Sequence, residues 1–273
     1  MKRIVFYVSD GTGLTSEILG HAMLTQFPTL QYDRLTLPYI QDRESAQRAV
    51  IKINEAAESY NTTPIVFSTL VKAEHRELIN QSKGFVLDAF AAFLEPLEKE
   101  LGVRSSLKVG QSHAIGNPET YRARIEAVHF ALESDDGGSR ARHYEKADII
   151  LVGLARTGKT PTSLYLALQF GLFAANYPIS EKDFTSNTLP KSLAGYENKL
   201  FGLHIDADRL AATREKLQPN TDYSSPERCY LETNGAESFF LAHNIKYLNV
   251  TELSVEEIST RILAATSLKR RLQ

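Results

Sequence analysis

The eight residues Gly153-Leu-Ala-Arg-Thr-Gly-Lys159-Thr160 decide how the second half of this chain is read. They fill every fixed position of Gly-x-x-x-x-Gly-Lys-Thr, the phosphate-binding P-loop pattern. The apolar run at residues 147–152 before them is typical of a buried strand, and residues 162–170 after them are typical of a helix. Strand, glycine loop and helix in this order predict a nucleotide phosphate site.

Each residue type in this loop has a physical role at a phosphate site. Glycines at 153 and 158 let the backbone turn tightly and approach the phosphates, while the loop amides and the helix N-terminus attract negative charge. Lys159 would reach the terminal phosphates, and Thr160 would offer its hydroxyl to Mg²⁺. The predicted nucleotide-binding residues are Gly153, Leu154, Ala155, Arg156, Thr157, Gly158, Lys159 and Thr160.

Composition excludes several classes of protein. The 273 residues are 42% hydrophobic and 23% charged, which is ordinary for a globular protein. A net charge of −2 gives no basic field for nucleic acid, and the apolar runs are too short to cross a membrane. Charged Lys2-Arg3 and polar Ser9-Asp10 closely flank the first apolar run, so we expect no signal peptide and a cytoplasmic location. Cys229 is the single cysteine, which leaves no intramolecular disulfide.

Strand-like and helix-like segments alternate along the chain, which predicts an α/β fold with parallel, helix-covered sheets. Residues 102–118 and 177–196 are expected to be irregular, because glycine and proline interrupt both. The predicted strands are 4–8, 34–37, 65–68, 85–88, 147–152, 199–205 and 247–250, and the predicted helices are 14–26, 43–59, 71–81, 89–101, 119–132, 162–170, 207–217, 236–244 and 255–265.

The sequence predicts a seam between two lobes near residues 138–146, after the turn Asp135-Asp136-Gly137-Gly138. The sequence therefore predicts an N-terminal α/β lobe at residues 1–145 and a P-loop, kinase-like lobe at residues 146–273.

Three further groups are candidates for chemistry. Ser9-Asp-Gly-Thr-Gly13 follows the first strand, where α/β folds bind ligands, but it would serve equally as a helix cap. Asp206 ends a later strand and would either hold Mg²⁺ or its waters, or cap the next helix. His113 and the pair Asp135 and Asp136 flank one predicted helix; the paired carboxylates would bind a metal or act as a base, with a plain helix-ending turn as the alternative.

Several segments together resemble one family over nearly the whole chain. They are Ser9 to His21, Gly110-Gln-Ser-His113, Tyr121-Arg-Ala-Arg-Ile125, Asp135-Asp136-Gly137, Gly153 to Ala167 and Lys199-Leu-Phe-Gly-Leu203. The extension Lys159-Thr-Pro-Thr-Ser163 is much more specific than a bare P-loop. The chain is similar to the regulatory proteins of phosphoenolpyruvate synthase and of pyruvate, phosphate dikinase.

This resemblance implies a bifunctional serine/threonine kinase and phosphotransferase. Such an enzyme phosphorylates a target threonine with ADP, which inactivates the target, and removes the phosphate with inorganic phosphate, which releases pyrophosphate. The partner implied first is phosphoenolpyruvate synthase (pyruvate, water dikinase), and pyruvate, phosphate dikinase is the close second. The resemblance places the nucleotide at Gly153 to Thr160; we hypothesise Asp135 or Asp136 as the base, with His113, Ser9 and Asp10 as helpers.

Two other functions fit the same loop. One is an ATP-dependent small-molecule kinase, and the other is a nucleotide-binding switch without catalysis. A GTPase is disfavoured, because no Asn-Lys-x-Asp follows the loop to bind guanine. A homodimer is plausible for a soluble enzyme on general grounds.

Overall fold

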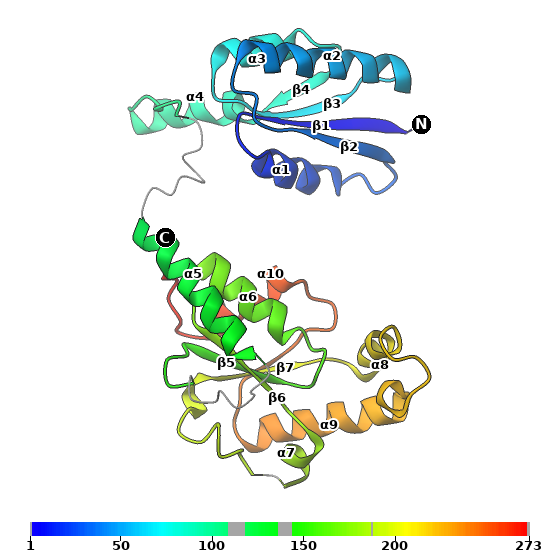
Figure 1. The fold of residues 1–273 in the computed structure, drawn as a ribbon, viewed down its shortest axis with the longest axis vertical. Helices are drawn as coiled ribbons and strands as arrows, with labels where there is room; N and C mark the ends of the chain where they lie inside the picture. The colour runs from blue at the N-terminus through cyan, green and yellow to red at the C-terminus, as the bar shows by residue number, and fades with distance from the viewer. Residues whose placement is uncertain (1, 109–117, 136–143, 187, 272–273) are drawn as a thin grey trace. The chain divides into compact units, whose positions relative to one another are not determined.

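The computed structural model describes residues 2–108, 118–135, 144–186 and 188–271, and it divides into two compact units (Figure 1). Unit 1 comprises residues 1–116 and unit 2 comprises residues 117–273. Each unit is an α/β fold built on a four-stranded parallel sheet, as the alternation of strands and helices predicts.

The sheet of unit 1 has the strand order β2-β1-β3-β4. Its strands run in parallel because a helix follows each of the first three and returns the chain to the same end of the sheet. The elements are β1 (Arg3–Ser9), α1 (Leu14–Leu24), β2 (Tyr32–Leu37), α2 (Arg43–Tyr60), β3 (Ile65–Thr69), α3 (Ala73–Asn80), β4 (Phe85–Asp88) and α4 (Ala89–Leu101).

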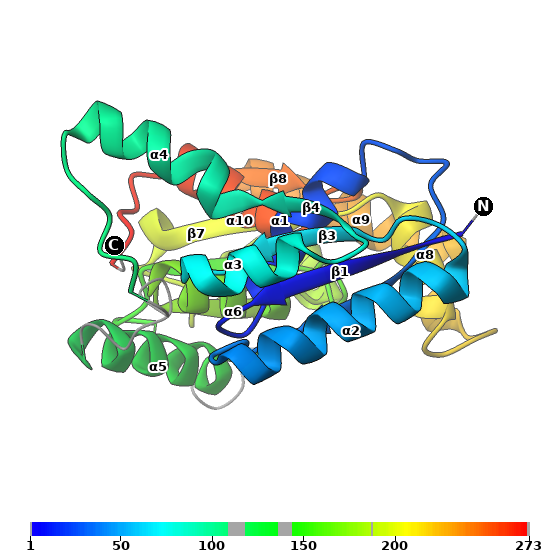
Figure 2. The same ribbon diagram turned by 90° about the horizontal axis from the view of Figure 1, so that it is seen from above.

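Helices cover both faces of this sheet, so β1 is buried along almost its whole length. Ile4, Phe6 and Val8 point to the face covered by α2 and α3, and α2 runs alongside β1 (Figure 2). Val5 and Tyr7 point to the opposite face, where α1 packs. Because successive side chains of a strand point to opposite faces, β1 contributes residues to two separate hydrophobic cores.

The sheet of unit 2 has the order β6-β5-β7-β8, and its strands are also parallel. Figure 1 shows α5, α6 and α10 over one face, and α7 and α9 over the other. The elements are α5 (Pro118–Glu133), β5 (Ile149–Gly153), α6 (Lys159–Phe170), β6 (Ala174–Pro178), α7 (Glu181–Ser186), β7 (Leu200–His204), α8 (Ala207–Glu215), α9 (Pro226–Ala242), β8 (Tyr247–Asn249) and α10 (Val255–Ala265), with short 3₁₀ turns at Glu197–Lys199 and Asp222–Ser224.

The division between the units falls earlier than the seam near residues 138–146 that the sequence suggests. Helix α5 belongs to unit 2, because it packs along α6 and beside β6. Phe130 of α5 stacks on Phe173 with ring centroids 4.9 Å apart. A helix belongs to the unit against which its apolar face packs. The turn that follows a helix in the sequence does not show where that face packs.

The structure differs from the sequence expectation in two regions of unit 2. Residues 177–196 are not uniformly irregular, since β6 ends at Pro178 and α7 follows. Strand β6 is an edge strand, which is where a sheet tolerates proline. Helix α9 begins at Pro226, ten residues before the predicted start at 236. Gly235 lies within this helix and weakens its sequence pattern. Glycine is needed there because a Cβ would lie 2.5 Å from the ring of Phe184.

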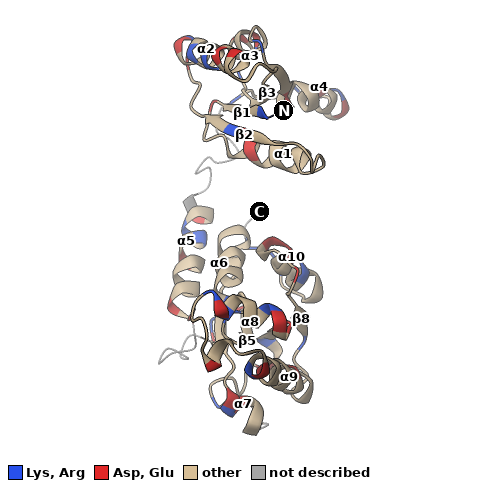
Figure 3. Cartoon of the chain, turned by 90° about the vertical axis from the view of Figure 1, so that its right-hand side faces the viewer, with Lys and Arg blue, Asp and Glu red and all other residues tan. Residues whose placement is uncertain are grey.

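Acidic and basic side chains are interspersed on the helices of each unit, including α2, α5 and α8 (Figure 3). No helix among the described residues is both long enough and apolar enough to traverse a lipid bilayer.

Candidate functional site

The loop between β5 and α6 has the backbone that its glycines predict. Gly153 ends β5, and a Cβ there would lie 2.6 Å from the carbonyl oxygen of Leu203 in the neighbouring strand β7. Gly158 has φ +83° and Arg156 has φ +75°, both in the left-handed region. Glycine is required at 153 by this close approach and at 158 by backbone conformation. Arg156 is a non-glycine residue held in a strained conformation, which is common in ligand-binding loops.

Lys159 is the first residue of α6, and its side chain folds back over the loop. It is only 4% exposed, and its Nζ donates a hydrogen bond of 2.8 Å to the carbonyl oxygen of Leu154. Thr157 donates to the same oxygen at 3.0 Å. The N-cap residue Gly158 makes no side-chain cap hydrogen bond, so the partial positive charge of the helix N-terminus lies beside the ammonium. Together these groups form a cradle suited to an anion.

A polar cluster lies beside this cradle and joins α5, α6 and β6. Asp135 accepts a hydrogen bond of 2.8 Å from the hydroxyl of Thr160 and another from the side-chain amide of Asn176. Asn176 is fully buried, and the same amide also donates to Ser163 at 3.3 Å. Two candidates that lie 25 residues apart in the chain, Asp135 and Thr160, are therefore in direct contact.

The family is shown by comparison with known proteins. The model of the kinase/pyrophosphorylase family matches residues 5–263. The chain belongs to this family.

Full-length relatives agree with this assignment. A protein of Alcanivorax borkumensis is 56% identical over 273 residues, covering 100% of both chains. Proteins of Acinetobacter baylyi and Marinobacter nauticus are each 51% identical and cover at least 98% of their own length. All three have the provisional name phosphoenolpyruvate synthase regulatory protein. A crystal structure of tagatose-6-phosphate ketose/aldose isomerase from Escherichia coli matches with a TM-score of 0.20 and 13% identity, which supports no argument.

The other residues that the sequence suggests for the site lie elsewhere in the chain or outside the described residues. Asp206 is exposed after β7, where its carboxylate accepts a 2.7 Å hydrogen bond from the side-chain amide of Asn249. Asp206 is the N-cap residue of α8 but makes no side-chain cap hydrogen bond. Asp136 and His113 lie outside the described residues, so their predicted roles stay predictions. Ser9 and Asp10 belong to unit 1.

Sequence reasoning missed the residues that support Asp135. The main-chain oxygen of Asn176 accepts a hydrogen bond of 2.9 Å from the hydroxyl of Tyr144, and its main-chain amide donates to Ser134 at 3.1 Å. Burial raises the pKa of Tyr144 far above its usual value, so this hydroxyl stays protonated and remains a donor. The available signal was the polar Asn176 within the small apolar segment of residues 172–177, which became informative only once β6 was recognised as a strand.

Proposed function

We propose that this chain is a bifunctional phosphotransferase that regulates phosphoenolpyruvate synthase. In one direction it transfers the β-phosphoryl group of ADP to a threonine of that enzyme, and in the other it transfers the phosphate from threonine to inorganic phosphate. The observation that supports the proposal best is the anion cradle of Lys159 with the adjoining pair Thr160 and Asp135, in a chain of the kinase/pyrophosphorylase family. The names of the relatives support the choice of target.

The kinase direction is an in-line displacement at phosphorus. The threonine oxygen attacks the β-phosphorus of ADP, the bond from that phosphorus to the bridging oxygen breaks, and AMP leaves with the oxygen. The hydroxyl proton passes to a base, for which Asp135 and Asp136 remain the candidates. Lys159 would leave the carbonyl of Leu154 and support the charge on the transferred group, because an anion is a stronger partner for an ammonium than a neutral carbonyl.

The reverse direction uses inorganic phosphate as the nucleophile. One of its oxygens attacks the phosphorus of phosphothreonine, the bond to the threonine oxygen breaks, and that oxygen takes up a proton as pyrophosphate forms. Inorganic phosphate would then occupy the position of the AMP phosphate that leaves in the kinase direction. We infer that one cradle serves both directions, with Lys159 facing the transferred phosphoryl group in each.

Mg²⁺ fits the oxygen groups beside the cradle. In nucleotide sites Mg²⁺ is usually held by one or two carboxylates together with phosphate oxygens. The hydroxyl of Thr160 and the carboxylate of Asp135 would hold it here, and it would neutralise charge on the phosphates. Asp206 remains a predicted partner for a metal-bound water. The described residues contain no group of three or more His, Cys, Asp or Glu side chains placed to hold a metal.

The test is transfer of label from β-labelled ADP to purified phosphoenolpyruvate synthase. Parallel reactions contain labelled ATP as donor or pyruvate, phosphate dikinase as target. We expect label on phosphoenolpyruvate synthase from ADP, and its release as pyrophosphate when phosphate is added. Label only on the other dikinase would change the target, and no label from ADP on either protein would contradict the proposal. We place the reaction in the cytoplasm, because it consumes ADP and phosphate.

A further inference from the structure

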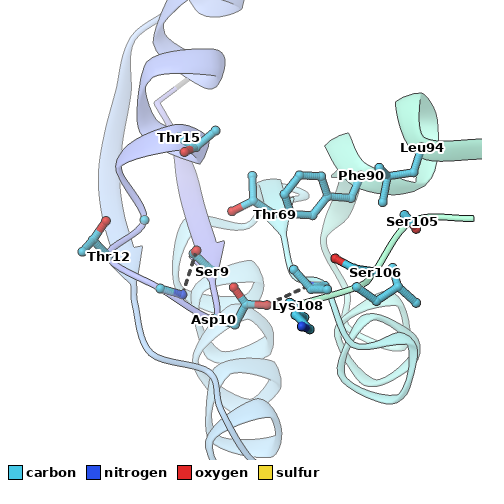
Figure 4. Close-up of a pocket in the computed structure, with 14 residues that line it drawn as sticks. Ser9, Asp10, Thr12, Thr15, Thr69, Phe90, Leu94, Ser105, Ser106 and Lys108 are labelled. Carbon is cyan, nitrogen blue, oxygen red and sulfur yellow. Dashed lines mark hydrogen bonds between the residues drawn. The ribbon is translucent and has the colours of Figure 1, made fainter. Parts of the chain in front are cut away.

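Unit 1 contains a cavity of about 430 Å³ at the carboxyl ends of β1 and β3. One wall is the turn of Ser9 to Gly13 between β1 and α1, and the opposite wall is formed by α4 and residues 105–108 (Figure 4). All of its lining residues belong to unit 1. A volume of this size is within the range of pockets that hold small organic ligands.

The cavity occupies the position in its sheet that the loop 153–160 occupies in unit 2. In both sheets the first strand lies between the second and the third, so the strand order reverses beside it. Ligands of open α/β sheets bind at this reversal, outside the carboxyl ends of the strands. Both turns end in a glycine of positive φ that is the N-cap residue of the next helix, Gly13 at +88° and Gly158 at +83°, and neither makes a side-chain cap hydrogen bond.

One end of the cavity is suited to an anion. The first-turn amides of α1 have no partner within the helix; that of Leu14 donates to Thr12 Oγ1 at 3.5 Å, and Gly13 offers no side chain to cap the others. Thr12 and Thr15 also line the cavity, and Lys108 contributes a cation from the opposite wall. Amides, hydroxyls and an ammonium around one space are the groups that bind a phosphate.

A second part of the cavity requires a hydrogen-bond donor. Asp10 is only 5% exposed, and its Oδ2 accepts a hydrogen bond of 2.8 Å from the amide of Val71, which fixes the carboxylate at the cavity wall. A bare anion placed against this carboxylate would be repelled, whereas ligand hydroxyls would donate to it. The ligand must therefore have a neutral, hydroxyl-bearing part next to its anionic group.

The third part of the cavity is apolar. Phe90 and Leu94 project from α4 toward the turn of Ser9 and Asp10 (Figure 4). An aromatic ring beside an aliphatic side chain favours a flat ring as its partner.

We propose that this cavity binds a nucleoside monophosphate. Its phosphate would lie at the N-terminus of α1 with Lys108, its ribose hydroxyls against Asp10, and its base against Phe90 and Leu94. The inference rests on unit 1 alone and does not depend on the phosphotransfer proposed for unit 2.

The test is hydrogen exchange of the full-length Lys159→Ala protein, whose loop in unit 2 lacks its phosphate-binding cation. Exchange is measured with AMP, adenosine or inorganic phosphate at equal concentrations. We expect AMP to protect amides in residues 10–16 and 104–108 more strongly than the other two ligands do. No protection of these segments at saturating AMP would overturn the proposal, and equal protection by inorganic phosphate would overturn the nucleoside assignment.

Three variants made in the same background sharpen this test. Gly11→Val adds bulk at the cavity wall, where a Cβ would meet only Ser9 Oγ, at 3.9 Å. Lys108→Ala removes the cation. Each should weaken AMP binding about tenfold or more, whereas Lys99→Ala, on the exposed surface of α4, should not change it. If Gly11→Val unfolds, Lys108→Ala alone tests the proposed site. Unchanged AMP affinity in Lys108→Ala would contradict the proposed anion site.

Discussion

Gly153 is the residue at which the geometry of the loop is most tightly constrained. A Cβ at this position would overlap the main-chain oxygen of Leu203, which belongs to a strand and cannot move aside cheaply. We expect Gly153→Ala to destabilise unit 2 by about 2 kcal/mol, as overpacking of a core does. Urea unfolding followed on unit 2 measures this, and an unchanged midpoint would contradict the close approach.

Gly158 provides a matched comparison, because its constraint is conformational and not steric. A Cβ there would meet nothing within 4 Å, but the residue has φ +83°. Gly158→Ala should cost about 1–2 kcal/mol from left-handed strain alone. If both alanine variants were as stable as the parent chain, the backbone described for residues 153–158 would be incorrect.

A variant of Asp135 can show whether this residue is a metal ligand or the catalytic base at the proposed site. Its carboxylate touches the hydroxyl of Thr160, which favours a shared Mg²⁺. If Asp135 holds the metal, Asp135→Asn should raise the Mg²⁺ concentration needed for half-maximal phosphoryl transfer by about tenfold or more, with much of the rate restored at high Mg²⁺. Titration of the rate with Mg²⁺ measures this. A rate that stays near zero at every Mg²⁺ concentration would indicate instead that Asp135 is the base.

At the scale of elements, a buried ion pair fastens α8 to α9. Arg214, whose side chain is 2% exposed, donates to Glu232 at 2.6 Å, and Arg228 donates to the other carboxylate oxygen at 2.7 Å. Burial alone would raise the pKa of Glu232, but the hydrogen bonds from the two arginines outweigh burial and hold the pKa below its usual value of 4.5. Because the folded-state pKa is depressed, this stabilisation is complete above pH 4.5 and is lost as pH falls through the folded-state value.

The variant Glu232→Gln tests this pH dependence. We expect it to be less stable than the parent chain by about 3 kcal/mol at pH 7, because it leaves a buried arginine without its charge partner. The difference should shrink as pH falls from 4.5 toward the lower folded-state pKa, because the unfolded parent takes up a proton on Glu232 in this range while the folded parent still resists it. Chemical unfolding between pH 7 and pH 4 measures it, with Glu227→Gln on the exposed first turn of α9 as the control. A difference that is constant over this range would contradict the depressed pKa.

The elements show how far the sequence could predict the structure. Helices α4 and α10 have the bounds 89–101 and 255–265 that their patterns indicate, since both are strongly amphipathic. Strand β6 was missed because Ala-Ala-Asn has little intrinsic strand preference and pairs only because β5 is beside it. The loop at residues 153–160 was located because its backbone demands glycine. The contact between Asp135 and Thr160 was not, because it depends on how α5 packs against α6.

At the scale of the whole molecule, the two units should unfold as separate steps. Each has its own sheet and its own hydrophobic cores, which is the condition for independent cooperative units. We expect two transitions in calorimetry of the full chain, and Gly153→Ala should lower only one of them. At a concentration of 100 times its Kd, ADP should add about 2.7 kcal/mol to that transition. A single transition raised as a whole by ADP would contradict independent units.

We propose that one cradle, centred on Lys159, serves both directions of phosphoryl transfer. The most direct measurement compares Lys159→Ala with Lys216→Ala, an exposed lysine at the end of α8, in both reactions: label transfer from β-labelled ADP to phosphoenolpyruvate synthase, and pyrophosphate release from the phosphorylated target. We expect Lys159→Ala to lower both rates by about a hundredfold or more while Lys216→Ala changes neither. Loss of one rate with the other intact would contradict the shared cradle.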